Sequence, residues 1–174
     1  FTHGDPQSNL NNQLAGVDLN LRSSNWWNEQ SVSWHGFFMT SDDEDENSDD
    51  VIGTHFTFPN YPFRASGHWV RTGDNFNPAL GFVRRRGGKS TGLGFTYYFE
   101  QPENELLEDI SVGAEYDRYE WLDGDLDSDE LEINLIGIRT LAGDFLGLEV
   151  EFERDILQEP FEIIDEVIIP SSEY

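Results

Sequence analysis

Four aspartates at alternate positions could coordinate a calcium ion. They are Asp123, Asp125, Asp127 and Asp129. Loops that bind calcium often place acidic side chains at every second position, because the ion takes many oxygen ligands. An EF-hand loop also needs Gly at its sixth position and Glu at its twelfth, where this chain has Ser128 and Asn134. We therefore predict a solvated loop over residues 123–130, with ordered calcium as the alternative.

Histidines and other carboxylates could hold a metal or act as acids and bases. His35, His55 and His68 fall on successive predicted strands, and we interpret them as lining a polar surface, with zinc as the alternative. A glycosidase pair could come from five acids: Glu115, Asp117, Glu149, Glu151 and Glu153. The chain has 35 acidic residues, so neighbouring carboxylates are expected by chance, and we predict no enzymatic activity.

The basic residues concentrate in the middle of the chain. From Tyr61 to Phe99 there are five arginines and one lysine against a single acid, Asp74. We predict a short strand at about 79–86, ending in Arg84, Arg85 and Arg86, and then a hairpin turn at Gly87-Gly88. Because side chains alternate along a strand, the three arginines cannot all face one way. We expect at least one pair of them to face a polar interior, where acidic strands neutralise it. The functional alternative is an anion-selective constriction.

Composition bounds the class of protein. The 174 residues carry a net charge of −25, which argues against nucleic acid and anionic membrane surfaces as partners. Thirteen Phe, six Tyr and five Trp argue against a disordered chain. There is no Cys, and no apolar run is long enough for a membrane-spanning helix. The chain begins with Phe1, so we expect it to be a fragment of a longer protein.

A period of two runs through most of the sequence and predicts strands. In the clearest case, Leu146, Leu148, Val150 and Phe152 alternate with Gly147, Glu149, Glu151 and Glu153. The other predicted strands lie near 15–22, 30–40, 51–58, 63–71, 92–99, 108–121 and 131–139. The acidic run at 41–50 is predicted to be a solvated loop. We find no convincing helix, and predict an all-β antiparallel meander.

Two environments could produce this pattern. In a soluble β-sandwich the apolar face packs against a second sheet. In an outer-membrane β-barrel it faces lipid, and the polar face lines the interior. We favour the barrel because several strands reach the roughly 9 to 11 residues that span a bilayer. Trp26, Trp27, Trp34 and Trp69 could form a sugar-stacking platform, but anchoring at the membrane interface explains them more simply.

The central motif resembles that of a known family. Residues 76–85 resemble the F-N-P-x-x-G-F-V-x-R signature of large Gram-negative surface proteins, in which a carbohydrate-binding-family-nine-like domain precedes an outer-membrane β-barrel of undefined function. The motif residues are Phe76, Asn77, Pro78, Gly81, Phe82, Val83 and Arg84. Residues 14–19 and 159–174 are similar to other parts of that family, although Ser171 and Ser172 stand where it tends to have glycine. The resemblance implies a barrel region without catalytic residues, and does not carry carbohydrate binding to this chain.

We therefore predict that residues 1–174 form a single outer-membrane β-barrel region, or part of one. Its predicted role is structural, or that of a pore or surface attachment. The expected partners are outer-membrane lipid, lipopolysaccharide bridged through divalent cations at the acidic loops, and other subunits of a surface assembly. The alternative is an exported soluble β-sandwich that acts as an adhesin or lectin-like binding module.

Overall fold

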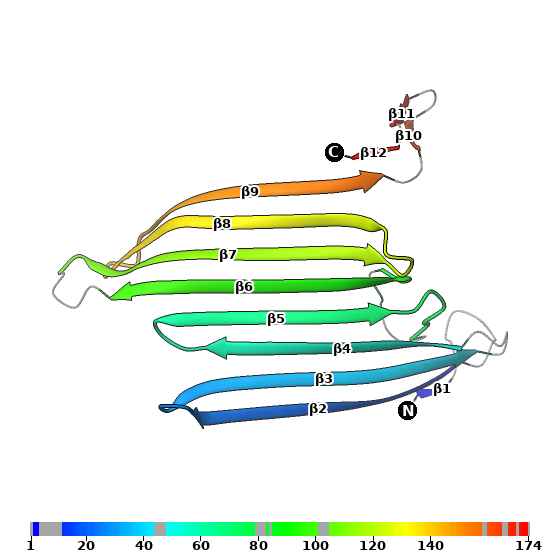
Figure 1. Cartoon of the computed structure of the whole chain (residues 1–174), viewed down its shortest axis with the longest axis horizontal. Helices are drawn as coiled ribbons and strands as arrows, with labels where there is room; N and C mark the ends of the chain where they lie inside the picture. The colour runs from blue at the N-terminus through cyan, green and yellow to red at the C-terminus, as the bar shows by residue number, and fades with distance from the viewer. Residues whose placement is uncertain are drawn as a thin grey trace.

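The chain folds into a single sheet of long antiparallel strands (Figure 1). The computed structural model describes residues 2–3, 12–43, 48–78, 83, 85–100, 105–157, 160–164, 167–169 and 171–173. The long strands are β2 (Asn12–Trp26), β3 (Gln30–Asp43), β4 (Ser48–Pro59), β5 (Phe63–Thr72), β6 (Gly88–Glu100), β7 (Leu107–Trp121), β8 (Leu126–Thr140) and β9 (Phe145–Leu157). Each pairs with the next along the chain, so the predicted all-β meander is confirmed.

Four short strands complete the described structure. β1 (Thr2–His3) pairs with the start of β2, and β12 (Ser172–Glu173) pairs with the end of β9. β10 (Phe161–Ile164) and β11 (Val167–Ile169) form a separate hairpin. The sheet is open, because β2 and β9 do not pair with each other. No described residue belongs to a helix that is long and apolar enough to cross a membrane.

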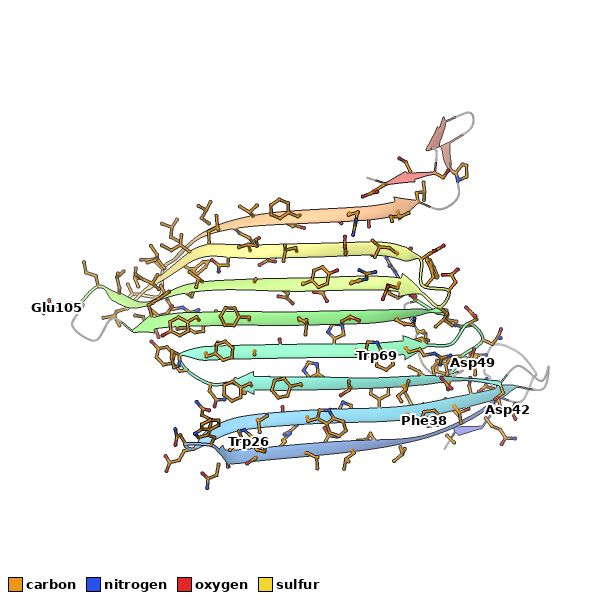
Figure 2. All side chains as sticks on the ribbon, viewed as in Figure 1. Trp26, Phe38, Asp42, Asp49, Trp69 and Glu105 are labelled. Carbon is orange, nitrogen blue, oxygen red and sulfur yellow. The ribbon has the colours of Figure 1, made fainter. Side chains whose placement is uncertain are left out.

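The two ends of the sheet differ. At one, the turn end, lie the turns at 27–29, 60–62 and 141–144 and the connection from β6 to β7. At the other, the loop end, lie the connection from β3 to β4, the long connection at 73–87 and the turn at 122–125. Figure 2 shows the two ends, with Asp42 and Asp49 at the loop end and Trp26 at the turn end.

Several predicted boundaries were wrong at the loop end. Val83, Arg85 and Arg86 are not in a strand, and Gly87 ends a long connection that leads directly into β6. The turn after β7 covers only 122–125, so β8 already includes Asp127 and Asp129. Asp49 and Asp50 likewise belong to β4. These strands accommodate Asp50, Asp127 and Asp129 because each of the three carboxylates is paired with an arginine.

The register separates the side chains into two faces. Residues directly opposite each other on antiparallel strands share a face. The apolar face is defined here by rows such as Leu21, Trp34, Phe56, Gly67, Leu93, Tyr116, Leu131 and Phe152. The polar face is defined by rows such as Asn20, His35, His55, His68, Gly92, Asp117, Glu130 and Glu153.

No second layer covers the apolar face of the described sheet. Leu93, in the middle of the sheet, is 59% exposed, and Val17 and Leu146 near the two edges are 67% and 69% exposed. The buried apolar side chains among the described residues are Val51 and Phe76. Both lie at the loop end, where the connection from β5 to β6 folds over the polar face. The apolar face of this sheet is therefore a surface that requires a partner.

Candidate functional site

The strongest candidate site is the connection from β5 to β6, defined by its described residues 73–78, 83 and 85–87. Its first part is fixed to strands β2, β3 and β4. Phe76 is only 2% exposed, and the Asn77 N–H donates to Ser41 Oγ at 2.8 Å. Asn12 Nδ2 donates to the Asn77 carbonyl at 3.1 Å. The Asn75 N–H donates to Asp49 Oδ2 at 3.0 Å, so the connection is held to the polar face of three strands.

The last part of the connection is fixed to the opposite half of the sheet. The Arg85 guanidinium forms an ion pair with Asp127 of β8 and lies 4.8 Å from the centre of the Tyr119 ring. The Tyr119 hydroxyl donates to the Arg86 carbonyl at 3.2 Å. The Gly87 N–H donates to the Gly73 carbonyl at 3.3 Å, which closes the base of the connection. The described parts of the connection thus contact strands from β2 to β8 on one face.

A polar cleft of about 630 Å³ lies beside the connection. Its lining includes Arg85 and Val83 from the connection and side chains of the polar face, among them His68, Asp117, Glu130 and Glu153. His68 Nε2 lies 3.9 Å from Asp117 Oδ1, although β6 separates their strands. Gly92 permits this approach, since a Cβ there would collide with both side chains.

The three histidines that were expected to line a polar surface, His35, His55 and His68, do lie side by side. His55 is directly opposite both His35 and His68, so all three share the polar face. Their polar contacts are separate, however: His35 Nε2 is 4.0 Å from Asp18, His55 Nε2 is 2.9 Å from Thr57 Oγ1, and His68 Nε2 is 3.1 Å from Ser90 Oγ. No group of three or more metal-binding side chains occurs in the described ranges.

Carboxylates crowd the polar face of β7, β8 and β9. Two rows consist entirely of acids: Glu115, Glu132 and Glu151 in one, and Asp117, Glu130 and Glu153 in the other. Glu149 lies on the same face, opposite Asn134. Like charges directly opposite each other are destabilising unless water or counterions screen them. This part of the sheet therefore forms an acidic wall that favours cations.

The aspartate series does not lie together in a loop. Asp123 and Asp125 are in the turn, where the Asp125 N–H donates to Asp123 Oδ1 at 3.0 Å. Asp127 pairs with Arg85, and Asp129 accepts from Arg154 Nε at 2.9 Å and from Arg154 Nη2 at 2.5 Å. Two of the four predicted calcium ligands are thus occupied by arginines.

Part of the central motif falls on the described connection. Phe76 and Asn77 are the anchors described above, Pro78 follows them, and Val83 lines the cleft. Gly81, Phe82 and Arg84 lie outside the described residues. The partners of the motif, Asn12, Ser41 and Tyr119, were missed because their positions in separate strands give no local signal.

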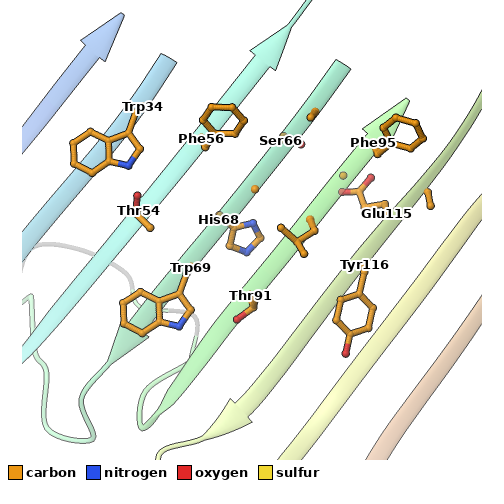
Figure 3. Close-up of a pocket in the computed structure, with 15 residues that line it drawn as sticks. Trp34, Thr54, Phe56, Ser66, His68, Trp69, Thr91, Phe95, Glu115 and Tyr116 are labelled. Atoms are coloured by element: carbon orange, nitrogen blue, oxygen red, sulfur yellow. The ribbon is translucent and has the colours of Figure 1, made fainter. Parts of the chain in front are cut away.

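The apolar face has its own depression of about 740 Å³ (Figure 3). Its lining includes the large side chains of Trp34, Phe56, Trp69, Phe95 and Tyr116. The small residues Ala65 and Gly67 also line it. Trp34 and Trp69 therefore lie on the apolar face, whereas Trp26 ends β2 and Trp27 is in the following turn. The lining offers few polar groups on this side with which to bind a sugar.

No family model matches the sequence, and comparisons with curated proteins and with solved structures give no match either. The resemblance noted in the sequence stays a prediction. The functional interpretation rests on the two faces and on the connection at 73–87.

Proposed function

We propose that the chain forms part of the wall of an outer-membrane β-barrel in a Gram-negative bacterium. In this proposal the apolar face contacts lipid acyl chains and the polar face lines an aqueous interior. The chain supplies a structural, pore or surface-attachment unit and no reaction of its own. The supporting observation is the uncovered apolar face, which extends across all strands from β2 to β9.

The dimensions of the sheet fit a bilayer. The long strands have 10 to 15 residues each, and a tilted strand needs roughly 9 to 11 to cross the hydrocarbon region. An open sheet edge is not tolerated in lipid, because its N–H and C=O groups find no water there. The proposal therefore requires that the free edges of β2 and β9 are paired in the assembled barrel, by each other, by further strands or by another subunit.

A belt of charged residues borders the apolar face at the loop end. It comprises Asp50, Arg71, Lys89, Arg118, Glu120, Asp129 and Arg154. Arg71 pairs with Asp50, and Arg118 Nη2 lies 2.7 Å from Glu120 Oε1. We propose that this belt lies at the level of the lipid head groups. There, together with the acidic loops and divalent cations, it would contact lipopolysaccharide.

Detergent dependence and native mass test this proposal together. We expect the purified chain to stay in solution only with detergent, and to give a mass above its own 20.0 kDa once bound detergent or partner subunits are counted. A monodisperse species of 20.0 kDa in plain buffer would contradict the proposal. The soluble sandwich would then be the better account, and a glycan-binding screen would follow.

A further inference from the structure

We propose that the connection at 73–87 is the constriction of the passage through the barrel, and that Arg85 sets how strongly this passage prefers cations. The inference rests on the proposed function, since it needs an aqueous interior bounded by the polar face. It concerns the described residues 73–78, 83 and 85–87 and the wall that they contact.

The described parts of the connection lie against the wall instead of extending beyond the rim. Its first part is held by Ser41 and Asn12, and its last part by Tyr119 and Asp127. These anchors come from strands at opposite sides of the described sheet. The strand residues that line the adjoining cleft come from β5 to β9, in the half of each strand nearer the loop end. When the sheet curves into a barrel, a segment fixed in this way reduces the free cross-section at the loop end.

Burial supports a fixed position for this segment. The side chains with less than 10% exposure under its first part are Asn12, Ser41, Val51 and Thr72, together with Phe76 of the connection itself. Elsewhere on the described sheet such burial is scarce, with Ser111 as a further polar example. A single aromatic anchor and several hydrogen bonds therefore hold the connection in place, as a constriction requires.

The charges around the connection predict the selectivity. Arg85 is neutralised by Asp127, while the acidic wall of β7, β8 and β9 has no arginine in its two fully acidic rows. Rings of carboxylates favour cations in pores. Arg85 lines the cleft that also contains Asp117, Glu130 and Glu153, and Arg118, which lines it too, is paired with Glu120. It should lower a preference for cations that the wall would otherwise make stronger.

A disulfide tests the position of the connection without reference to membranes. The chain contains no Cys, so the double variant Ser41→Cys/Asn77→Cys has no competing thiols. We expect oxidation to consume both thiols of this variant, in the native fold and without denaturant. The matched control is Thr40→Cys/Asn77→Cys, because Thr40 is adjacent in β3 but points to the opposite face, and it should keep both thiols. Free thiols in both variants would overturn the inference.

Channel recordings on the full chain in planar bilayers test the function. We expect Arg85→Ala to shift the reversal potential, measured in a salt gradient, towards the equilibrium potential of the cation, because the passage becomes more selective for cations. Arg64→Ala removes the same charge from the polar face at the turn end, and should give a clearly smaller shift. Equal shifts for the two arginine variants would overturn the inference and leave the proposed function standing. A chain that inserts without conducting overturns the constriction alone, whereas a chain that does not insert overturns both.

Discussion

The two faces of this sheet are built by the same strands and yet suit opposite environments. In β9, Leu146, Leu148, Val150 and Phe152 point one way, and Gly147, Glu149, Glu151 and Glu153 point the other. Because successive side chains alternate across a strand, apolar and polar residues that are neighbours in the sequence lie on opposite faces of the sheet. The comparison shows that neither face resembles a folded core: one is apolar and uncovered, the other is charged and crowded.

The polar face nevertheless contains the only well-packed region of the described structure. Phe76 of the connection at 73–87 and Val51 of β4 are buried there, whereas many large apolar side chains of the other face remain exposed. The apolar face must therefore gain its stability from outside the chain, and the loop end of the polar face gains it from within.

Phe76→Ala should have the largest effect. Removing a buried aromatic side chain costs about 3 to 5 kcal/mol of unfolding free energy in protein cores, because a cavity remains. Phe152→Ala is the matched control, since Phe152 is 58% exposed and, in the proposed barrel, lipid would fill the space that it leaves. Urea titration in lipid vesicles measures the unfolding free energy of both variants. Equal losses would show that the connection is not packed as described.

Leu93→Arg should rank second. A cation on the lipid-facing side near the middle of a barrel strand costs about 2 to 4 kcal/mol. Ser66→Arg, on the neighbouring strand but on the polar face, should cost much less because water reaches it. Refolding yield and urea titration in vesicles compare the two variants. If Ser66→Arg were the more damaging substitution, the assignment of the faces would be reversed.

Asp129→Asn should cause a smaller loss of unfolding free energy than the two substitutions above. The substitution removes the negative charge and one of the two oxygens that accept from Arg154, but both side chains are partly exposed, and exposed ion pairs contribute little. Asp123→Asn, in the turn, should leave the unfolding midpoint unchanged and serves as the control. A larger effect at Asp123 would mean that the turn, and not the pair in the sheet, carries the stabilising contact.

Adding calcium should have the smallest effect on the stability of the chain. Asp127 and Asp129 are already paired with arginines, which leaves Asp123 and Asp125 as too few ligands for an ordered ion. We therefore expect calcium to give no greater stabilisation than magnesium at equal ionic strength in thermal unfolding. A calcium-specific rise that Asp123→Asn abolishes would instead favour ordered calcium, the alternative considered for this loop from the sequence.

The sequence was sufficient to predict the long strands but not the structure of the described parts of the connection at 73–87. The alternation of apolar and polar residues identified most of β2 to β9, because each face has a uniform environment and each strand position therefore has a predictable polarity. The run from Phe76 to Arg86 also looks like a short strand, since an apolar segment lies between a proline and two glycines. Its described residues Asn77 and Arg86 instead contact Asn12, Ser41 and Tyr119, which are distant in sequence. Likewise, Asp127 and Asp129 suggested a loop because their partners Arg85 and Arg154 could not be paired with them from sequence alone.

Tryptophan fluorescence offers the most direct test that the apolar face contacts lipid. Trp34 lies on the apolar face and Trp121 on the polar face, where it is opposite Gly88. Two variants would each keep one of these and replace the other four tryptophans by Phe, and both would be inserted into vesicles of acyl-chain-brominated phospholipid. We predict strong quenching by bromine for Trp34 and little for Trp121. Equal quenching of the two, or none for Trp34, would contradict the assignment of the apolar face to lipid.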